Sequence, residues 1–250
     1  MKAISEPMQK QEEIIKRFDW DYLIGLDACR ADSFEQYNKL EGSYERVETP
    51  KGDTIAWYNY MFPAKYSMRL YSASPLLRSK VALFDYFAGA HFRKVYDIWD
   101  TDWNEERQTT LPESVYEYAR EAPKKSIIWF EQPHFPPINE KDKDLWPDEK
   151  RLKTEGGGYL LTMIFTGKIS AERVKQAHFN NVKAVMPWVE KLVSELEGKI
   201  LITADHGELL GETYAVENGI PQIGWLHSER VFGAYRPKEL YTVPMLVIEK

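Results

Sequence analysis

The chain places an acid and an imidazole side by side at the end of an apolar run. The segment KILITADHGE contains Asp205 and His206, and the segment DYLIGLDA contains Asp27 near its end. A carboxylate beside an imidazole suits a divalent metal such as Zn²⁺, Mn²⁺ or Mg²⁺. An isolated Asp-His pair is more often a loop or capping feature, so the pair alone is weak support for a metal site.

Repetition of this arrangement favours the metal site. The apolar runs at 21–28, 126–132 and 199–205 have the length of buried strands, and each is followed at once by polar side chains. The second run contains Glu131 near its end and is followed by His134. Ligands of open α/β sheets bind at the carboxyl ends of the strands, so we expect the three strand ends to face one crevice.

The remaining pattern predicts the elements that position these residues. We expect helices at 8–18, over CRADSFEQYNKL and at 170–196, with a kink or break at Pro187, and a last strand at 243–250. Strands that alternate with helices predict a mostly parallel central sheet covered by helices on both faces.

Composition limits the domain count and the function classes. The 250 residues, 43% of them hydrophobic, predict one α/β domain over 1–250, with the Lys-, Asp- and Gly-rich stretch 138–169 as a surface excursion. The net charge of −6 gives no signal for nucleic-acid binding. Cys29 is the only cysteine, which excludes an intramolecular disulfide. No transmembrane or signal-like apolar segment is found, so we expect a cytoplasmic protein.

Four segments together resemble a known family. LIGLDACRADSF, FEQPHFPP, LITADHGELLGE and TVPMLVIEK are similar to successive motifs of the alkaline phosphatase superfamily, in particular its sulfatase-like and phosphodiesterase-like branches. The resemblance runs from about residue 20 to the end of the chain, with Glu131 and Gln132 replacing the earlier residues of the family's His-x-Pro-His-x-Pro loop. It implies an alkaline phosphatase-like α/β domain and a metal-dependent esterase.

The resemblance also implies roles for single residues. Asp27, Asp205 and His206 would be metal ligands, and the nucleophile should lie on a loop that enters a helix. Thr54, in TPKGDTIAWYNYMF, is the best candidate and would also contact the metal. The alternative is that Thr54 serves only as the helix N-cap. Ser72 and Ser74 are reserve candidates for the nucleophile.

No sulfatase modification signal is present. CRADS has no proline two residues after Cys29, and SASPLLRS places its Arg one position late. This favours a Thr-dependent hydrolase or transferase of phosphate mono- or diesters, acting on a small-molecule or polymer substrate. A sulfoester hydrolase without formylglycine and a non-catalytic ligand-binding member of the fold are the alternatives.

The other polar residues supply the substrate half of the expected site. His134 would bind the ester oxygens or protonate the leaving group. His227 could bind the same oxygens, and Arg30 could pair with the phosphate or with an acid such as Asp32. We expect Glu208 to order its loop.

Metal count is left open between one ion and two. A second ion would be held by Glu131, His134 and His227, but PHFPP resembles members with one metal, which favours one Mn²⁺, Zn²⁺, Mg²⁺ or Ca²⁺. His91 and His178 are expected to be structural.

Overall fold

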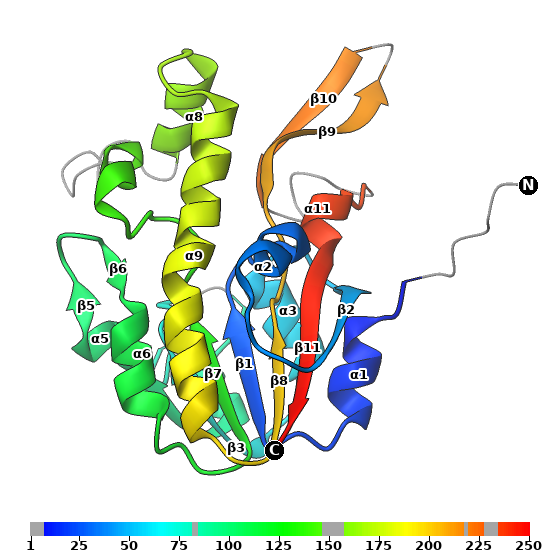
Figure 1. Cartoon of the computed structure of the whole chain (residues 1–250), viewed down its shortest axis with the longest axis vertical. Helices are drawn as coiled ribbons and strands as arrows, with labels where there is room; N and C mark the ends of the chain where they lie inside the picture. Colours follow the sequence, from blue (N-terminus) through cyan, green and yellow to red (C-terminus); the bar gives the residue numbers. More distant parts are fainter. Residues whose placement is uncertain (1–7, 82–84, 147–157, 218–219, 228–234) are drawn as a thin grey trace, which may run out of the picture.

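A seven-stranded sheet forms the centre of the computed structural model, which describes residues 8–81, 85–146, 158–217, 220–227 and 235–250 (Figure 1). β11 is antiparallel to both of its neighbours, whereas all other neighbouring strands are parallel. The predicted mostly parallel sheet is therefore confirmed. In spatial order the strands are β2 (Ser43–Glu48), β11 (Thr242–Glu249), β8 (Lys199–Thr203), β1 (Tyr22–Leu26), β7 (Ser126–Phe130), β3 (Tyr66–Ser72) and β4 (Phe92–Asp97).

The three central strands carry the main hydrophobic core. All five residues of β1 and of β7 are buried, as continuous apolar runs in a sheet covered on both faces must be. A Cβ added to Gly25 would lie 2.0 Å from the indole of Trp129, so glycine is required for the ring to cross β1. Trp129 thereby occupies the space over the strand that ends at Asp27.

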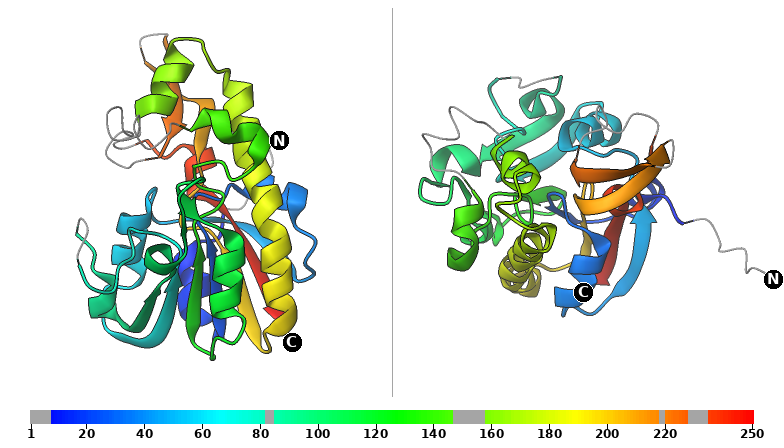
Figure 2. Two further views of the ribbon diagram at one scale, coloured as in Figure 1. Left: turned by 90° about the vertical axis from the view of Figure 1, so that its left-hand side faces the viewer. Right: turned by 90° about the horizontal axis from the view of Figure 1, so that it is seen from above.

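Helices cover both faces of the sheet (Figure 2). The long helix α9 (Ala171–Glu195) packs on one face with α6 (Pro112–Ala119) and α2 (Ala31–Tyr37), and α3 (Thr54–Met61) lies on the other. α9 confirms the predicted helix at 170–196, and one face of it is a buried stripe of mostly apolar residues that includes Val174, Ala177, Val185, Val189 and Leu192. It continues through Pro187, so the expected break is absent.

The N-terminal helix joins the sheet to α3. α1 (Gln11–Arg17) is shorter than the predicted 8–18, and buried Gln11 donates to Thr203 Oγ1 and to the carbonyl of Ala204. The indole of Trp57 donates to Gln11 Oε1 over 2.7 Å. These bonds fix the end of β8, next to Asp205.

Two features project beyond the carboxyl end of the sheet (Figure 1). A hairpin of β9 (Leu209–Glu217) and β10 (Ile220–Leu226), which the sequence pattern did not predict, follows the Asp-His segment. The stretch 138–169 contains the 3₁₀ helix η1 (Glu140–Leu145) and α8 (Gly158–Phe165), while 147–157 lie outside the described residues. Leu145 and Leu160 pack against α9, and the assignment of 138–169 as a surface excursion stays a prediction.

Short elements complete the described part of the chain. No helix in that part is both long and apolar enough to span a membrane. The short elements are α4 (Ala88–His91), α5 (Ile98–Thr101), β5 (Trp103–Asn104), β6 (Thr109–Thr110) and α11 (Lys238–Tyr241).

Candidate active site

The candidate site lies at the carboxyl end of the central strands. β1 pairs in parallel with both β7 and β8, so the residues that follow the three strands meet at one edge of the sheet. Asp27 follows β1, Asp205 follows β8, and the loop with His134 follows β7. The predicted convergence of the three strand ends is thus present.

Asp27, Asp205 and His206 form what we call the carboxylate cluster. One ligand-type atom from each lies within 4.8 Å of the others, and all three side chains are buried. His206 Nε2 is 3.3 Å from Asp205 Oδ2 and 3.8 Å from Asp27 Oδ1. Among the described residues, both of these carboxylate oxygens are buried and lack a hydrogen-bond donor. Buried polar atoms are rarely left unpaired, so these oxygens fit ligands for a cation.

The surrounding backbone leaves one atom of each side chain free for the cation. Asp205 Oδ1 accepts from the amides of Ala28 (3.2 Å) and His206 (2.9 Å), which leaves Oδ2 unpaired. His206 Nδ1 lies 2.7 Å from the carbonyl of Gly207. Because a carbonyl only accepts, Nδ1 carries the proton and the lone pair of Nε2 faces the cluster, as in histidines that bind metals.

Electrostatics supports the same fit. Burial raises the pKa of Asp27 well above its usual range, and the charge of Asp205 raises it further. Burial lowers the pKa of the His206 imidazole, so the ring is neutral near pH 7. Two buried carboxylates beside a neutral imidazole form a negative site that a divalent cation would balance. Asp27, Asp205 and His206 therefore fit the divalent metal that the sequence predicted.

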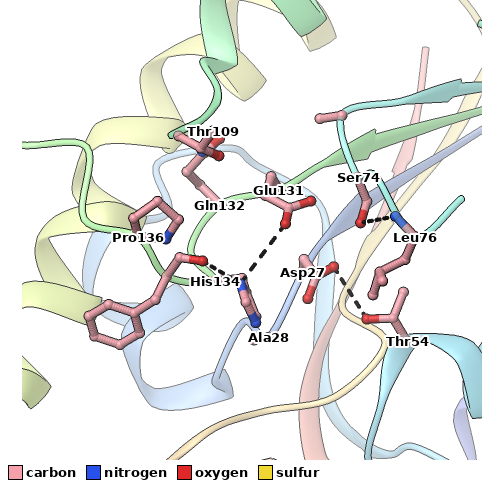
Figure 3. Close-up of polar contacts among 12 residues, drawn as sticks. Asp27, Ala28, Thr54, Ser74, Leu76, Thr109, Glu131, Gln132, His134 and Pro136 are labelled. Carbon is pink, nitrogen blue, oxygen red and sulfur yellow. Dashed lines mark hydrogen bonds and ion pairs between the residues drawn. The ribbon is translucent and has the colours of Figure 1, made fainter. Parts of the chain in front are cut away.

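Thr54 lies beside Asp27 of the carboxylate cluster (Figure 3). It is the first residue of α3, and Asp53 is the N-cap, because the carboxylate of Asp53 accepts from the amide of Ala56. The alternative that Thr54 is the cap is therefore wrong. Thr54 Oγ1 lies 3.3 Å from Asp27 Oδ2 and 3.5 Å from His206 Nε2. This position allows Thr54 to attack a group bound at the cluster.

His134, Glu208 and His227 form a second group, the histidine cluster. Their ligand-type atoms lie within 4.8 Å of one another, and His227 Nδ1 is 3.0 Å from Glu208 Oε2. Burial lowers the pKa of His227, but the charge of Glu208 more than offsets this and the pKa is raised. Burial lowers the pKa of His134 to about 4. The ring centroids of His206 and His227 are 4.3 Å apart, so the two clusters adjoin.

Glu131 lies near His134 and Ser74 (Figure 3). Its carboxylate is 4.0 Å from His134 Nδ1, and burial raises its pKa to about 8. The predicted second metal set was Glu131, His134 and His227. The structure brings His134 and His227 together with Glu208, rather than Glu131, as the third residue of the close group.

Arg30 lies in a buried ion-pair network. Its guanidinium forms a two-bond fork with Asp32 (2.9 and 2.8 Å), and Nη1 contacts Glu212 at 2.5 Å. Nη1 also donates to the carbonyl of Glu208. The structure thus pairs Arg30 with acids, the second of the two roles that the sequence left open.

The remaining predicted residues have local roles. Ser72 Oγ donates to the carbonyl of Ser74, and Ser74 Oγ accepts from the amide of Leu76. Burial raises the pKa of the Cys29 thiol, so it is not a thiolate nucleophile. The ring of His91 stacks on Tyr86 at 4.6 Å, which fits its expected structural role.

Two side chains of α9 contact the site loops, although neither was predicted to belong to the site. His178 was expected to be structural, and its Nε2 lies 3.0 Å from the carbonyl of Ala28. Asn181 donates to the carbonyls of Pro133, His134 and Pro136. The available signal was a His and an Asn three residues apart on the buried face of an otherwise apolar stripe.

Comparison with solved structures identifies the fold. The integral membrane lipooligosaccharide phosphoethanolamine transferase A of Neisseria meningitidis matches with a TM-score of 0.54 and 12% identity over 97% of this chain. The C-terminal periplasmic domain of EcEptC from Escherichia coli matches with 0.52 and 12% over 98% of this chain and 76% of its own. This chain spans 48% of the Neisseria protein. These likenesses confirm the expected alkaline phosphatase-like fold. No family model and no curated protein matches the sequence significantly.

The comparison contradicts one prediction. The expected cytoplasmic location is wrong, because the matched E. coli structure is a periplasmic domain.

Proposed function

We propose that the protein is a metal-dependent hydrolase or transferase of phosphate mono- or diesters in which Thr54 is the nucleophile. One observation carries the proposal: Thr54 Oγ1 lies 3.3 Å from Asp27 and 3.5 Å from His206, in a cluster where two buried carboxylate oxygens have no hydrogen-bond partner among the described residues. A structural Thr would need no such surroundings. The chain shares its fold with a phosphoethanolamine transferase, whose name describes the transfer of a phosphate ester, and this likeness supports the same reaction class.

The carboxylate cluster would hold one divalent ion through Asp27, Asp205 and His206, with Thr54 alongside. An ion bound there would lower the pKa of the Thr54 hydroxyl and attract the oxygens of the ester. Reloading the metal-stripped protein with Mn²⁺, Zn²⁺, Mg²⁺ or Ca²⁺ would identify the ion that supports activity. Oxygen and imidazole ligands are compatible with each of these ions to different degrees.

The side chains would divide the chemistry between them. Thr54 Oγ1 forms the bond to phosphorus, and its proton has an acceptor in Asp27 Oδ2, 3.3 Å away. The bond from phosphorus to the leaving oxygen breaks as His227 donates a proton to that oxygen. His227 suits this role because the charge of Glu208 favours its protonated form. Attack on the phosphothreonine by water gives hydrolysis, and attack by an alcohol gives transfer.

The proposed location of the enzyme depends on the comparison with solved structures. We propose that the protein works outside the cytoplasm, as the matched E. coli periplasmic domain does. A small-molecule or polymer ester exposed there is the substrate class. Nothing in the proposal requires a nucleic-acid partner.

Hydrolysis of paired aryl esters tests the reaction class. Metal-stripped protein would be reloaded separately with Mn²⁺, Zn²⁺, Mg²⁺ and Ca²⁺ and assayed on a phosphate monoester, a phosphodiester and a sulfate ester. We expect metal-dependent phosphoester cleavage that is lost in Thr54→Ala and partly kept in Thr54→Ser, which retains a hydroxyl. Thr101→Ala, at an exposed position on α5, is the matched control and should retain full activity.

Two results would contradict the proposal. Cleavage of the sulfate ester alone would favour the sulfoester alternative. Phosphoester cleavage by Thr54→Ala at the wild-type rate would exclude Thr54 as the nucleophile.

A further inference from the structure

A polar side chain of α9 reaches the turn that connects β1 to α2. His178 is fully buried, and its ring is placed by Phe135 and Phe179 at centroid distances of 6.4 and 6.3 Å. Its Nε2 donates to the carbonyl of Ala28 over 3.0 Å. The helix thereby contacts the residue that directly follows Asp27.

Ala28 connects His178 to the carboxylate cluster. The amide of Ala28 donates to Asp205 Oδ1 over 3.2 Å, while its carbonyl accepts from His178. Ala28 has a φ of 58°, in the left-handed region that is unfavourable for a residue with a Cβ. The turn therefore needs outside contacts to hold it in this conformation, and His178 supplies one of them.

The second ring nitrogen argues against a purely stabilising role. His178 Nδ1 is buried and has no hydrogen-bond partner among the described residues. A ring with one unpaired nitrogen costs free energy that an apolar side chain of similar size would avoid. The bond to Ala28 is thus the distinguishing property of an imidazole at this position.

We propose that His178 is a positioning residue: by holding the Ala28 turn, it directs the Ala28 amide at Asp205 Oδ1 and so keeps Asp205 Oδ2 aimed at the metal. This inference rests on the proposed function, since it assumes that the carboxylate cluster binds an ion. His178 itself touches neither the ion nor the substrate.

Metal affinity provides the direct test. Zn²⁺ and Mn²⁺ would each be titrated calorimetrically into metal-stripped wild-type protein, His178→Leu and His178→Gln. Loss of a residue that orients a metal ligand typically weakens binding by about 10- to 100-fold, and we expect about tenfold for His178→Leu because the effect passes through Ala28. His178→Gln places an amide donor near the position of Nε2 and should restore the affinity.

A matched control separates positioning from general damage to α9. Asn180 is a buried polar residue on the same helix, and its amide donates to Asp142 Oδ2 over 2.7 Å, away from the Ala28 turn. We expect Asn180→Ala to leave the metal affinity unchanged. If His178→Leu fails to fold by circular dichroism, His178→Asn, whose amide is too short to reach Ala28, takes its place.

The outcomes distinguish the two proposals. Three results would each overturn the positioning role and leave the metal site intact. The folded His178 variant that lacks the donor could bind metal with wild-type affinity, Asn180→Ala could weaken metal binding to the same extent, or His178→Gln could fail to restore the affinity. A wild-type protein that binds neither ion, nor Mg²⁺ or Ca²⁺ titrated in the same way, would overturn the metal site and the positioning role together.

Discussion

The two halves of the site differ in how their charges are balanced. The carboxylate cluster holds two acids and a neutral imidazole, with two buried oxygens unpaired among the described residues. In the histidine cluster, Glu208 faces His227 at 3.0 Å, and its charge favours the imidazolium. The carboxylate cluster contains no positively charged side chain, whereas the histidine cluster contains the His227 imidazolium. We infer that the carboxylate cluster binds a cation and the histidine cluster handles protons or anionic oxygens.

Removal of one carboxylate from the cation-binding half should have the largest effect. We expect Asp205→Asn to lose metal binding and to lower kcat/KM by about a thousandfold, because a bound metal supplies several kcal/mol of transition-state stabilisation. Asp19→Asn removes an acid whose side chain is 85% exposed and serves as the control. Steady-state kinetics at saturating metal measure both, and unchanged turnover in Asp205→Asn would overturn the assignment.

Metal should reverse the stability order of the wild type and a second variant. Without metal, Asp27→Asn should be more stable than the wild type, because it removes a carboxyl group whose ionisation is opposed by burial and by the charge of Asp205. Metal at 100-fold above Kd should then stabilise only the wild type by about 2.7 kcal/mol, which corresponds to about 5–10 °C in Tm. Thermal melts with and without chelator measure the shift. An equal shift in Asp27→Asn would place the ion elsewhere.

The contribution of the histidine cluster to stability should depend on pH. The raised pKa of His227 contributes stability that is fully present below the ordinary histidine pKa and is lost as pH rises through the raised value. Glu208→Gln removes the charge that raises this pKa. We expect the variant to lack that gain in stability on acidification and its His227 ring to titrate at lower pH.

Two measurements check this expectation. Proton NMR of the histidine rings in metal-free protein follows the titration, and Tm between about pH 5 and 8 follows the stability. Glu197→Gln, at an exposed position after α9, is the control. Identical His227 titration curves in Glu208→Gln and the wild type would show that the pair does not set the charge of this half.

The difference between the halves also explains what the sequence could predict. Asp27, Asp205 and His206 directly follow the strands β1 and β8, so pattern and topology sufficed to group them. Glu208 and His227 meet only because the β9–β10 hairpin returns the chain to the site, and the sequence pattern did not reveal that hairpin. Contacts made by side chains of one element with the backbone of another are hidden from periodicity in the same way.

His178 and the N-cap of α3 illustrate this limit. The bond from His178 to Ala28 joins residues 150 positions apart and depends on how α9 packs against the sheet. At α3, both Asp53 and Thr54 are good capping residues, and only the backbone decides between them. The fold class needed no such detail, because it follows from the order of strands and helices.

Substitution of Arg30 should have the smallest effect on activity. It tests whether Arg30 binds substrate or only stabilises the structure around the two clusters. The sequence allowed it to bind substrate, whereas the structure pairs its buried guanidinium with Asp32 and Glu212. We expect Arg30→Lys to lose the two-bond fork and to lower the free energy of unfolding by about 1–3 kcal/mol. KM should stay within about twofold of the wild type, since no uniform binding to substrate is removed.

A second arginine with the same fork provides the control for this variant. Arg46 pairs with Glu35 through Nε at 2.7 Å and Nη2 at 2.5 Å, but its side chain is 41% exposed. Arg46→Lys should therefore cost less than about 1 kcal/mol, as exposed pairs do. Urea unfolding and steady-state kinetics measure both variants. A raised KM in Arg30→Lys at unchanged stability would instead show that Arg30 binds the substrate. The anionic oxygens of the ester would then contact Arg30 as well as the histidine cluster.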